Sequence, residues 1–227
     1  YGATIDPDFG MDKVPLLDRG FVYAIAHVRG GSFLGYKWYE DGKMENKMNT
    51  FTDFIACAEH LIEEKYTNKQ GITIEGRSAG GLLVGASMAL RPDLFRTVIA
   101  GVPFVDLLNT MQDETIPLTT QEWEQWGNPN EEKFYDYMNS YSPIDNVIEQ
   151  RYPNILITTS LSDNRVLFDE PAKFTAKLRD YKTDNNLLLL KTEMNAGHGG
   201  KSGRDGAIEE IAIDYAFALK ISKKLKG

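Results

Sequence analysis

The sequence predicts an α/β fold in which a mostly parallel central sheet is covered by helices on both faces. Two observations lead to this prediction. Short apolar runs alternate along the chain with amphipathic stretches long enough to form helices. Several of these runs are apolar throughout, as strands are when both faces of their sheet are buried. The chain has 227 residues, which is enough for a sizeable core, and we expect residues 1–227 to form one domain.

The first half of the chain alternates twice between strand and helix. The β-branched and aromatic run Phe21–Val28 predicts a buried strand, and apolar residues at helical spacing within 51–65 predict the helix that follows it. The run 72–75 predicts a second strand. The next helix is expected to end at Leu90, because a proline two residues later disfavours its continuation.

The second half contains three more expected strands and two helices around an irregular stretch. Proline and glycine residues interrupt any long element between 103 and 150, which predicts an insertion or cap. Pro171 suits the first turn of a helix, where its missing N–H costs nothing. The remaining strands and the closing helix are expected at Thr97–Val102, Ile155–Thr159, Leu187–Lys191 and 208–219.

Composition narrows the classes of partner. The 25 Lys and Arg against 33 Asp and Glu give a net charge of −8, which disfavours nucleic acid and anionic membrane surfaces and favours cationic molecules or basic peptides. No apolar run is long enough to predict a membrane span. The only cysteine, Cys57, cannot form an intrachain disulfide and is expected to be a buried small residue of its helix. These features leave the cellular compartment open.

A candidate nucleophile stands at the junction of the second expected strand and its helix. The segment Gly76-Arg77-Ser78-Ala79-Gly80 has the form G-x-S-x-G, in which a sharp turn projects the serine hydroxyl above a helix N-terminus. We expect the small residues two places before and after Ser78 to permit that turn. The N–H of Ala79 would then point at a developing oxyanion. An ordinary glycine-rich turn is the alternative interpretation of the motif alone.

A serine nucleophile needs a base, and the chain contains three histidines, His27, His60 and His198. In α/β-hydrolases the order along the chain is serine, acid, histidine, and only His198 follows Ser78. His198 lies in a glycine-rich loop after the last expected strand, which predicts that it is the general base.

The acid that orients this base is expected after a strand between the serine and the histidine. Asp163 fits, because it directly follows the strand expected at 155–159. Asp169 and Glu170 are rivals, but they precede Pro171 and are better explained as helix N-cap residues. We therefore predict the triad Ser78, Asp163 and His198.

Four longer strings carry a specific resemblance that extends over nearly the whole chain. They are Tyr1–Asp8, Gly76–Gly81, Ile116–Pro129 and Gly197–Arg204. Together they resemble the oligopeptidase B branch of the prolyl oligopeptidase family of serine peptidases. The resemblance implies an α/β-hydrolase fold, hydrolysis of short peptides after Arg or Lys through an acyl-enzyme, and the same triad with Ala79 as an oxyanion donor.

The resemblance also implies a set of substrate-binding residues. Glu122 and Glu124 match an acidic pair that receives the Arg or Lys side chain before the cut, and two carboxylates suit a guanidinium fork. Asp6 and Asp8 match a second acidic pair for a basic residue one place further upstream, although Asp and Pro here also favour a turn. Arg165 matches an arginine that binds a substrate carbonyl.

The expected partners follow from the same resemblance. It implies short basic peptides as substrate and no metal or organic cofactor. It also implies an N-terminal β-propeller and an upstream tyrosine that completes the oxyanion hole, both outside this chain. Two rival functions remain at this point, a peptidase or esterase of neutral specificity and a non-catalytic interaction domain with the same fold.

Overall fold

The computed structural model describes residues 1–6 and 8–223, and its centre is a four-stranded parallel sheet in the order β1-β2-β3-β4. Neighbouring strands pair in parallel, with Gly76 opposite Ala100 and Ile157 opposite Leu190. The strands are β1 (Thr73–Arg77), β2 (Thr97–Gly101), β3 (Asn154–Ser160) and β4 (Leu188–Glu193). Four strand predictions are thereby confirmed, each to within two residues at either end.

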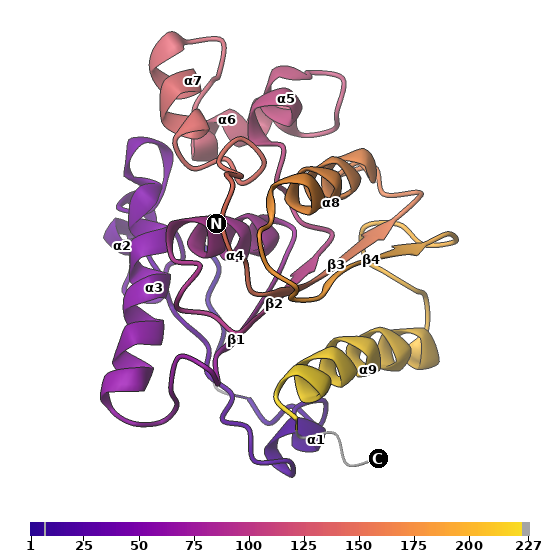
Figure 1. The fold of residues 1–227 in the computed structure, drawn as a ribbon. Helices are drawn as coiled ribbons and strands as arrows, with labels where there is room; N and C mark the ends of the chain where they lie inside the picture. The colour runs from indigo at the N-terminus through magenta and orange to yellow at the C-terminus, as the bar shows by residue number, and fades with distance from the viewer. Residues whose placement is uncertain (7, 224–227) are drawn as a thin grey trace.

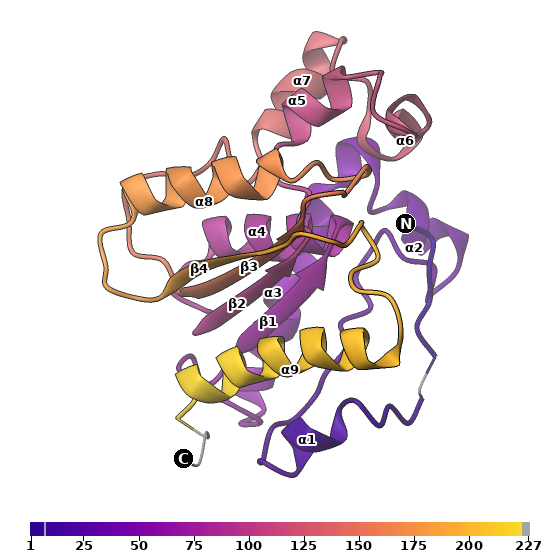
Figure 2. The same cartoon turned by 90° about the vertical axis from the view of Figure 1, so that its right-hand side faces the viewer.

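Helices cover both faces of the sheet (Figure 1). α3, α4 and α8 lie on one face and α9 crosses the other, as Figure 2 shows from the side. The larger helices are α3 (Met48–Glu63), α4 (Ala79–Leu90), α8 (Asp169–Tyr181) and α9 (Arg204–Ile221). The N-terminal part carries three short helical pieces, α1 (Val14–Leu17), α2 (Tyr36–Glu40) and η1 (Met44–Asn46).

The core is divided by the sheet. On the face of α3, α4 and α8, Val98 and Ala100 of β2 join a large cluster with residues such as Phe174 of α8. The residue between them, Ile99, points the other way and packs with Phe217 of α9. β2 is buried throughout, so its uniformly apolar sequence reflects burial on both faces.

The stretch 103–150 differs from its prediction as irregular. It forms three short helices above the carboxyl ends of the strands, namely α5 (Leu107–Gln112), α6 (Thr119–Trp126) and α7 (Glu132–Asn139). The prolines and the glycine that suggested irregularity lie before, between and after these helices rather than within them. Their apolar sides form a third cluster with Leu82, Phe104 and Val166, so the stretch is a packed layer over the site end of the sheet.

Two further predictions are wrong. Phe21–Val28 is not a strand but an extended segment outside the sheet, and its Val22, Tyr23 and Ile25 side chains are exposed. A strand pairs with a neighbouring strand, and the sheet of the described residues consists of β1, β2, β3 and β4 without this segment. Cys57 is exposed rather than buried, because it lies on the solvent side of α3 while Ile55 and Ala58 face the core.

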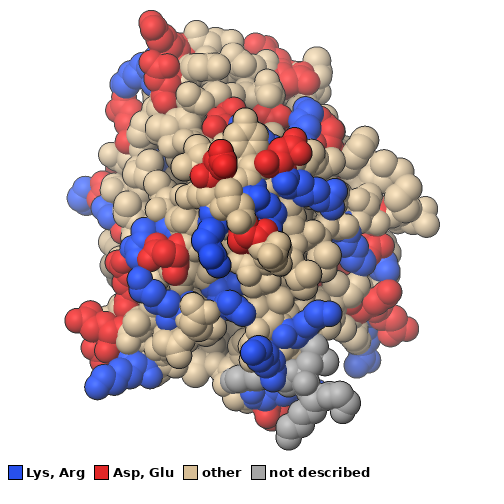
Figure 3. All heavy atoms as spheres, viewed as in Figure 1, with Lys and Arg blue, Asp and Glu red and all other residues tan. Residues whose placement is uncertain are grey.

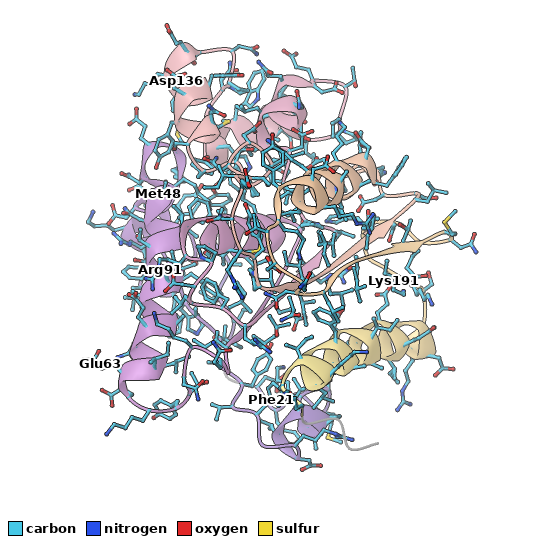
Figure 4. The ribbon with its side chains drawn as sticks, viewed as in Figure 1. Phe21, Met48, Glu63, Arg91, Asp136 and Lys191 are labelled. Carbon is cyan, nitrogen blue, oxygen red and sulfur yellow. The ribbon has the colours of Figure 1, made fainter. Side chains whose placement is uncertain are left out.

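Charged residues of both signs are interspersed over the face shown in Figure 3. Apolar and polar side chains fill the spaces between the sheet and its helices, and Lys191 of β4 lies on the side of the sheet that α9 covers (Figure 4). None of the helices in residues 1–6 and 8–223 is both long and apolar enough to cross a membrane. The described residues contain no group of three or more His, Cys, Asp or Glu placed to hold a metal ion.

Candidate active site

Ser78 occupies a strained turn between β1 and α4. Its φ of 55° and ψ of −118° lie outside the regions that a residue with a side chain normally adopts. Such a conformation costs on the order of 1–3 kcal/mol and needs surrounding structure to hold it. Here the Ser78 N–H donates to the Gly101 carbonyl at 2.9 Å, and the Ser78 carbonyl accepts from Phe104 N–H at 3.1 Å. The neighbouring strand β2 and the chain after it thus fix the turn.

The glycines of the turn have unequal roles. A Cβ on Gly76 would overlap the carbonyl oxygen of Gly80, so the turn closes only with glycine at position 76. A Cβ on Gly80 would meet nothing within 4 Å, so the expectation that Gly80 is needed sterically is wrong. The tight approach is instead at Gly81, where a Cβ would overlap the backbone of Pro103. This glycine is what lets α4 pack against the chain that follows β2.

The loops after β3 and β4 bring two more side chains to Ser78. Nε2 of His198 lies 3.0 Å from Oγ of Ser78, and Nδ1 of the same ring lies 2.7 Å from Oδ2 of Asp163. Asp163 has no exposed side-chain surface. Its other oxygen, Oδ1, accepts the N–H groups of Arg165 and Val166 at 2.9 and 3.0 Å. The three side chains thus form a hydrogen-bonded row, and Asp163 holds the imidazole from a fixed position.

Ala79 begins α4 directly after the serine. The first N–H groups of a helix have no acceptor within the helix, and they carry the positive end of its dipole. Ala79 also lines the cavity beside Ser78, so its N–H is available to a negative oxygen that forms there.

A cavity of about 130 Å³ opens beside the serine. Glu122 of α6 is the acidic side chain among its lining residues. Oε2 of Glu122 accepts the indole N–H of Trp126 at 2.9 Å. The remaining lining residues come from the turn, from the α5–α6 layer and from the loops after β3 and β4, and they are Ser78, Ala79, Phe104, Thr110, Met111, Ile116, Pro117, Thr119, Arg165, Val166 and His198.

Trp126, which holds Glu122, is itself fixed by its surroundings. It is buried, its ring packs edge-on against Phe104 and Tyr1, and Nζ of Lys47 lies 4.9 Å from its ring centre. Lys47 is also buried, and this burial lowers its pKa to about 7. The resemblance named the acid but not the tryptophan that orients it.

The other predicted binding residues are not gathered equally. Arg165 lines the cavity from the loop after Asp163. Glu124 is exposed and does not line it, because residues two apart on a helix point to nearly opposite sides. Asp6 and Asp8 are exposed on the N-terminal segment and do not line it either. Of the four acids predicted to bind substrate, the cavity lining therefore contains Glu122, together with the cation Arg165.

Glu170 has a role that the sequence did not indicate. Phe168 is the N-cap of α8, so Asp169 and Glu170 belong to the first turn and the prediction that they are caps is wrong. The buried Glu170 carboxylate accepts the N–H groups of Val105 and Asp106, both at 3.0 Å, and contacts the Thr110 hydroxyl. Burial raises the pKa of Glu170 to about 7. Glu170 thus links α8 to the start of α5, whose Thr110 lines the cavity.

Comparison with known proteins gives consistent similarities. The profile of the prolyl oligopeptidase family matches residues 7–225. "Protease 2" of Moraxella lacunata is 54% identical over 219 residues, which are 96% of this chain and 32% of that protein. "Dipeptidyl aminopeptidase BI" of Pseudoxanthomonas mexicana is 49% identical over 96% of this chain and 30% of its own. The chain spans about a third of the length of these two relatives.

Solved structures agree with the sequence comparison. Oligopeptidase B from Leishmania major superposes with a TM-score of 0.96 at 54% identity, over 98% of this chain and 31% of that one. Oligopeptidase B from Trypanosoma brucei, with covalently bound antipain in a closed form, gives a TM-score of 0.95 at 56% identity, over 98% and 31% of the two chains.

Proposed function

The chain belongs to the prolyl oligopeptidase family and has an α/β-hydrolase fold, and we propose that it is the catalytic part of a serine peptidase that cleaves short peptides after Arg or Lys. The observation that carries the hydrolytic part of this proposal is the hydrogen-bonded row of Ser78, His198 and Asp163.

In the proposed first half-reaction, Oγ of Ser78 attacks the carbonyl carbon of the scissile peptide bond while Nε2 of His198 takes its proton. The carbonyl oxygen becomes negative and is stabilised by the Ala79 N–H. Collapse of this intermediate breaks the C–N bond, and His198 returns the proton to the leaving amine. An ester of Ser78 with the acyl part of the peptide remains.

In the second half-reaction, water attacks the ester carbon and gives a proton to His198. The bond to Oγ of Ser78 then breaks, and His198 returns the proton to that oxygen as the acid product leaves. Asp163 keeps Nδ1 protonated and stabilises the ring when it is charged. The similar oligopeptidase B from Trypanosoma brucei holds antipain in a covalent bond, which supports a nucleophile that forms such an intermediate.

The proposed preference for a basic residue rests on Glu122. An Arg or Lys side chain that entered the cavity would place its cation by the carboxylate of Glu122, whereas a neutral side chain would leave that carboxylate without a cationic partner. Arg165, which lines the same cavity, is proposed to bind a substrate carbonyl. Asp6 and Asp8 keep a proposed role only through the resemblance, because both are exposed outside the cavity lining.

A second candidate function is a peptidase of neutral specificity. It is favoured by the presence of Arg165 in the same cavity and by the absence of Glu124 from it, which leaves one acid where a pair was expected. The names of the relatives also differ, since one is a dipeptidyl aminopeptidase and others are oligopeptidases.

The test uses the intact protein that contains this chain, because the relatives are about three times as long and we propose that a β-propeller domain accompanies the catalytic part. Labelling by a fluorophosphonate is expected in the wild type and absent in Ser78→Ala. Peptides that differ only in Arg, Lys, Pro or Leu before the cut are then compared by kcat/KM.

Glu122→Gln is expected to lower kcat/KM for the Arg peptide by about 10–100-fold, the worth of a hydrogen bond to a charged group, and to leave the Leu peptide unchanged. Glu124→Gln is the matched control two residues away, and it should change neither value by more than about twofold. An unchanged preference for Arg in Glu122→Gln would contradict the role proposed for Glu122, whereas a wild type that cleaves the Pro or Leu peptide better than the Arg peptide would favour the second candidate.

A further inference from the structure

We propose that Glu210 of α9 is a positioning residue for His198, which it holds in place through the backbone of the loop that carries the histidine. The inference rests on the proposed function, because it assigns a support to the proposed general base. It comes from the contacts between α9 and the turn that holds His198.

His198 stands on a small turn between Gly197 and Gly200. The N–H of Gly200 donates to the carbonyl of Gly197 at 3.0 Å and closes the turn. The His198 side chain is 27% exposed, so burial alone does not fix it. The ring lies 3.0 Å from Ser78 on one side and 2.7 Å from Asp163 on the other. Its position therefore depends on how the two ends of its turn are anchored.

The two ends are anchored to different parts of the molecule. Before the turn, the Ala196 carbonyl accepts the N–H of Ser162, which ties it to the loop of Asp163 at 3.2 Å. After the turn, the Lys201 N–H donates to Oε1 of Glu210 at 2.9 Å. The second anchor thus comes from the helix on the opposite face of the sheet from α4 and α8 (Figure 2).

The fit between Glu210 and the turn is close. A Cβ built on Gly200 would overlap both carboxylate oxygens of Glu210. Gly200 also has a φ of +81°, which favours glycine. The carboxylate therefore lies directly against the backbone of the turn, and no other residue at position 200 would admit it there.

The adjacent Glu209 differs in the part of Lys201 that it contacts. Its Oε2 lies 2.8 Å from Nζ of Lys201, and its side chain is 61% exposed. The same ammonium lies 3.5 Å from Oε2 of Glu193 at the end of β4. Glu209 thus contacts only the side chain of Lys201, whereas Glu210 holds the main chain three residues from the histidine.

The experiment compares Glu210→Ala, Glu210→Gln and the control Glu209→Ala in the intact protein. Displacing a catalytic group by about 1 Å costs roughly 10²-fold in rate, so Glu210→Ala is expected to lower kcat and the rate of fluorophosphonate labelling by about that factor. KM should stay within about twofold, because Glu122 and Arg165, the proposed substrate-binding residues of the cavity, are unchanged. Glutamine keeps an oxygen acceptor and should restore kcat to within about fivefold of the wild type.

Hydrogen exchange at the Lys201 amide provides a readout that does not need activity. It should accelerate in Glu210→Ala and stay unchanged in Glu209→Ala. Unchanged exchange or an unchanged kcat in Glu210→Ala would overturn the inference, as would an equal loss in Glu209→Ala or no recovery in Glu210→Gln. A wild type that neither reacts with fluorophosphonate nor cleaves peptides would instead contradict the proposed function, and the exchange data would still decide whether Glu210 holds the turn.

Discussion

Replacing Glu170 by glutamine is expected to make the stability of this domain less dependent on pH. The carboxylate is buried between α8 and the start of α5, and this burial raises its pKa from the usual 4.5 to about 7. Glutamine has the same shape, can accept the N–H groups of Val105 and Asp106, and can donate to the Thr110 hydroxyl. The substitution therefore removes the titration with little change in packing.

The direction of this pH dependence follows from the direction in which the pKa of Glu170 is shifted. Because the pKa of Glu170 is higher in the folded state, the folded protein holds the proton more tightly than the unfolded chain does. The stability that this proton confers is lost as the pH rises from about 4.5 through about 7. At about 1.4 kcal/mol per pKa unit, the free energy of unfolding of the wild type should fall by roughly 2.5 kcal/mol more than that of the variant between pH 5 and pH 8. Asp214, whose pKa burial also raises to about 7, is common to both proteins and cancels in the comparison.

The assay is urea unfolding at pH 5, 6, 7 and 8, monitored by hydrogen exchange in peptides from β2 and β3. The difference in unfolding free energy between variant and wild type should grow steadily with pH. Asp169→Asn is the control, and because its side chain is 42% exposed it should change stability by no more than about 1 kcal/mol. Parallel pH dependences for wild type and Glu170→Gln would refute the reasoning.

Three other predictions concern the turn, the cavity and the cysteine. Gly76→Ala should lower the free energy of unfolding by about 3 kcal/mol, because the added Cβ would overlap the Gly80 carbonyl. Gly80→Ala should raise it by up to about 1 kcal/mol, because position 80 is helical and has open space for a Cβ. Thermal unfolding compares the two variants with the wild type. Trp126→Phe removes the N–H that donates to Glu122, and it should raise KM for an Arg peptide by about five- to tenfold. KM for a Leu peptide should not change. An equal rise in KM for both peptides would contradict the role of the indole. Cys57 is exposed as a residue, but partial desolvation of its sulfur and the nearby Asp53 raise the pKa of the thiol. It should therefore react with a maleimide in the folded protein, but more slowly than free cysteine near pH 7. A thiol that stays unlabelled until the protein unfolds would contradict this.

The sequence predicted the central elements well because their patterns are long or uniform. The helix predicted at 51–65 corresponds to α3, and the apolar run after Arg96 corresponds to β2. Phe21–Val28 has the composition of a strand, but composition does not reveal whether a neighbouring strand is available. The helices α5, α6 and α7 have six to eight residues each, too few for a period of 3.6 to stand out among the prolines.

The residues of the candidate site also differ in how well the sequence predicts them. Ser78 was predicted from a local motif, and His198 and Asp163 from chain order and from the strands before them. Glu124 was assigned with Glu122 by resemblance, but the helix that contains both directs them to different sides. The role of Glu170 was missed because its partners lie 60 to 65 residues earlier in the chain, and no local pattern reports such a contact.

The extended segment 21–28 has a consequence for handling the protein. It presents exposed apolar side chains, and β1 has a strand neighbour on one side only among the described residues. Surfaces of this kind favour strand-to-strand association between molecules. The net charge of −8 opposes such contacts, but salt at about 0.15 M screens it beyond roughly 8 Å. Concentrated solutions of this chain alone should therefore become turbid as salt is added, and dilute low-salt buffer should clear them.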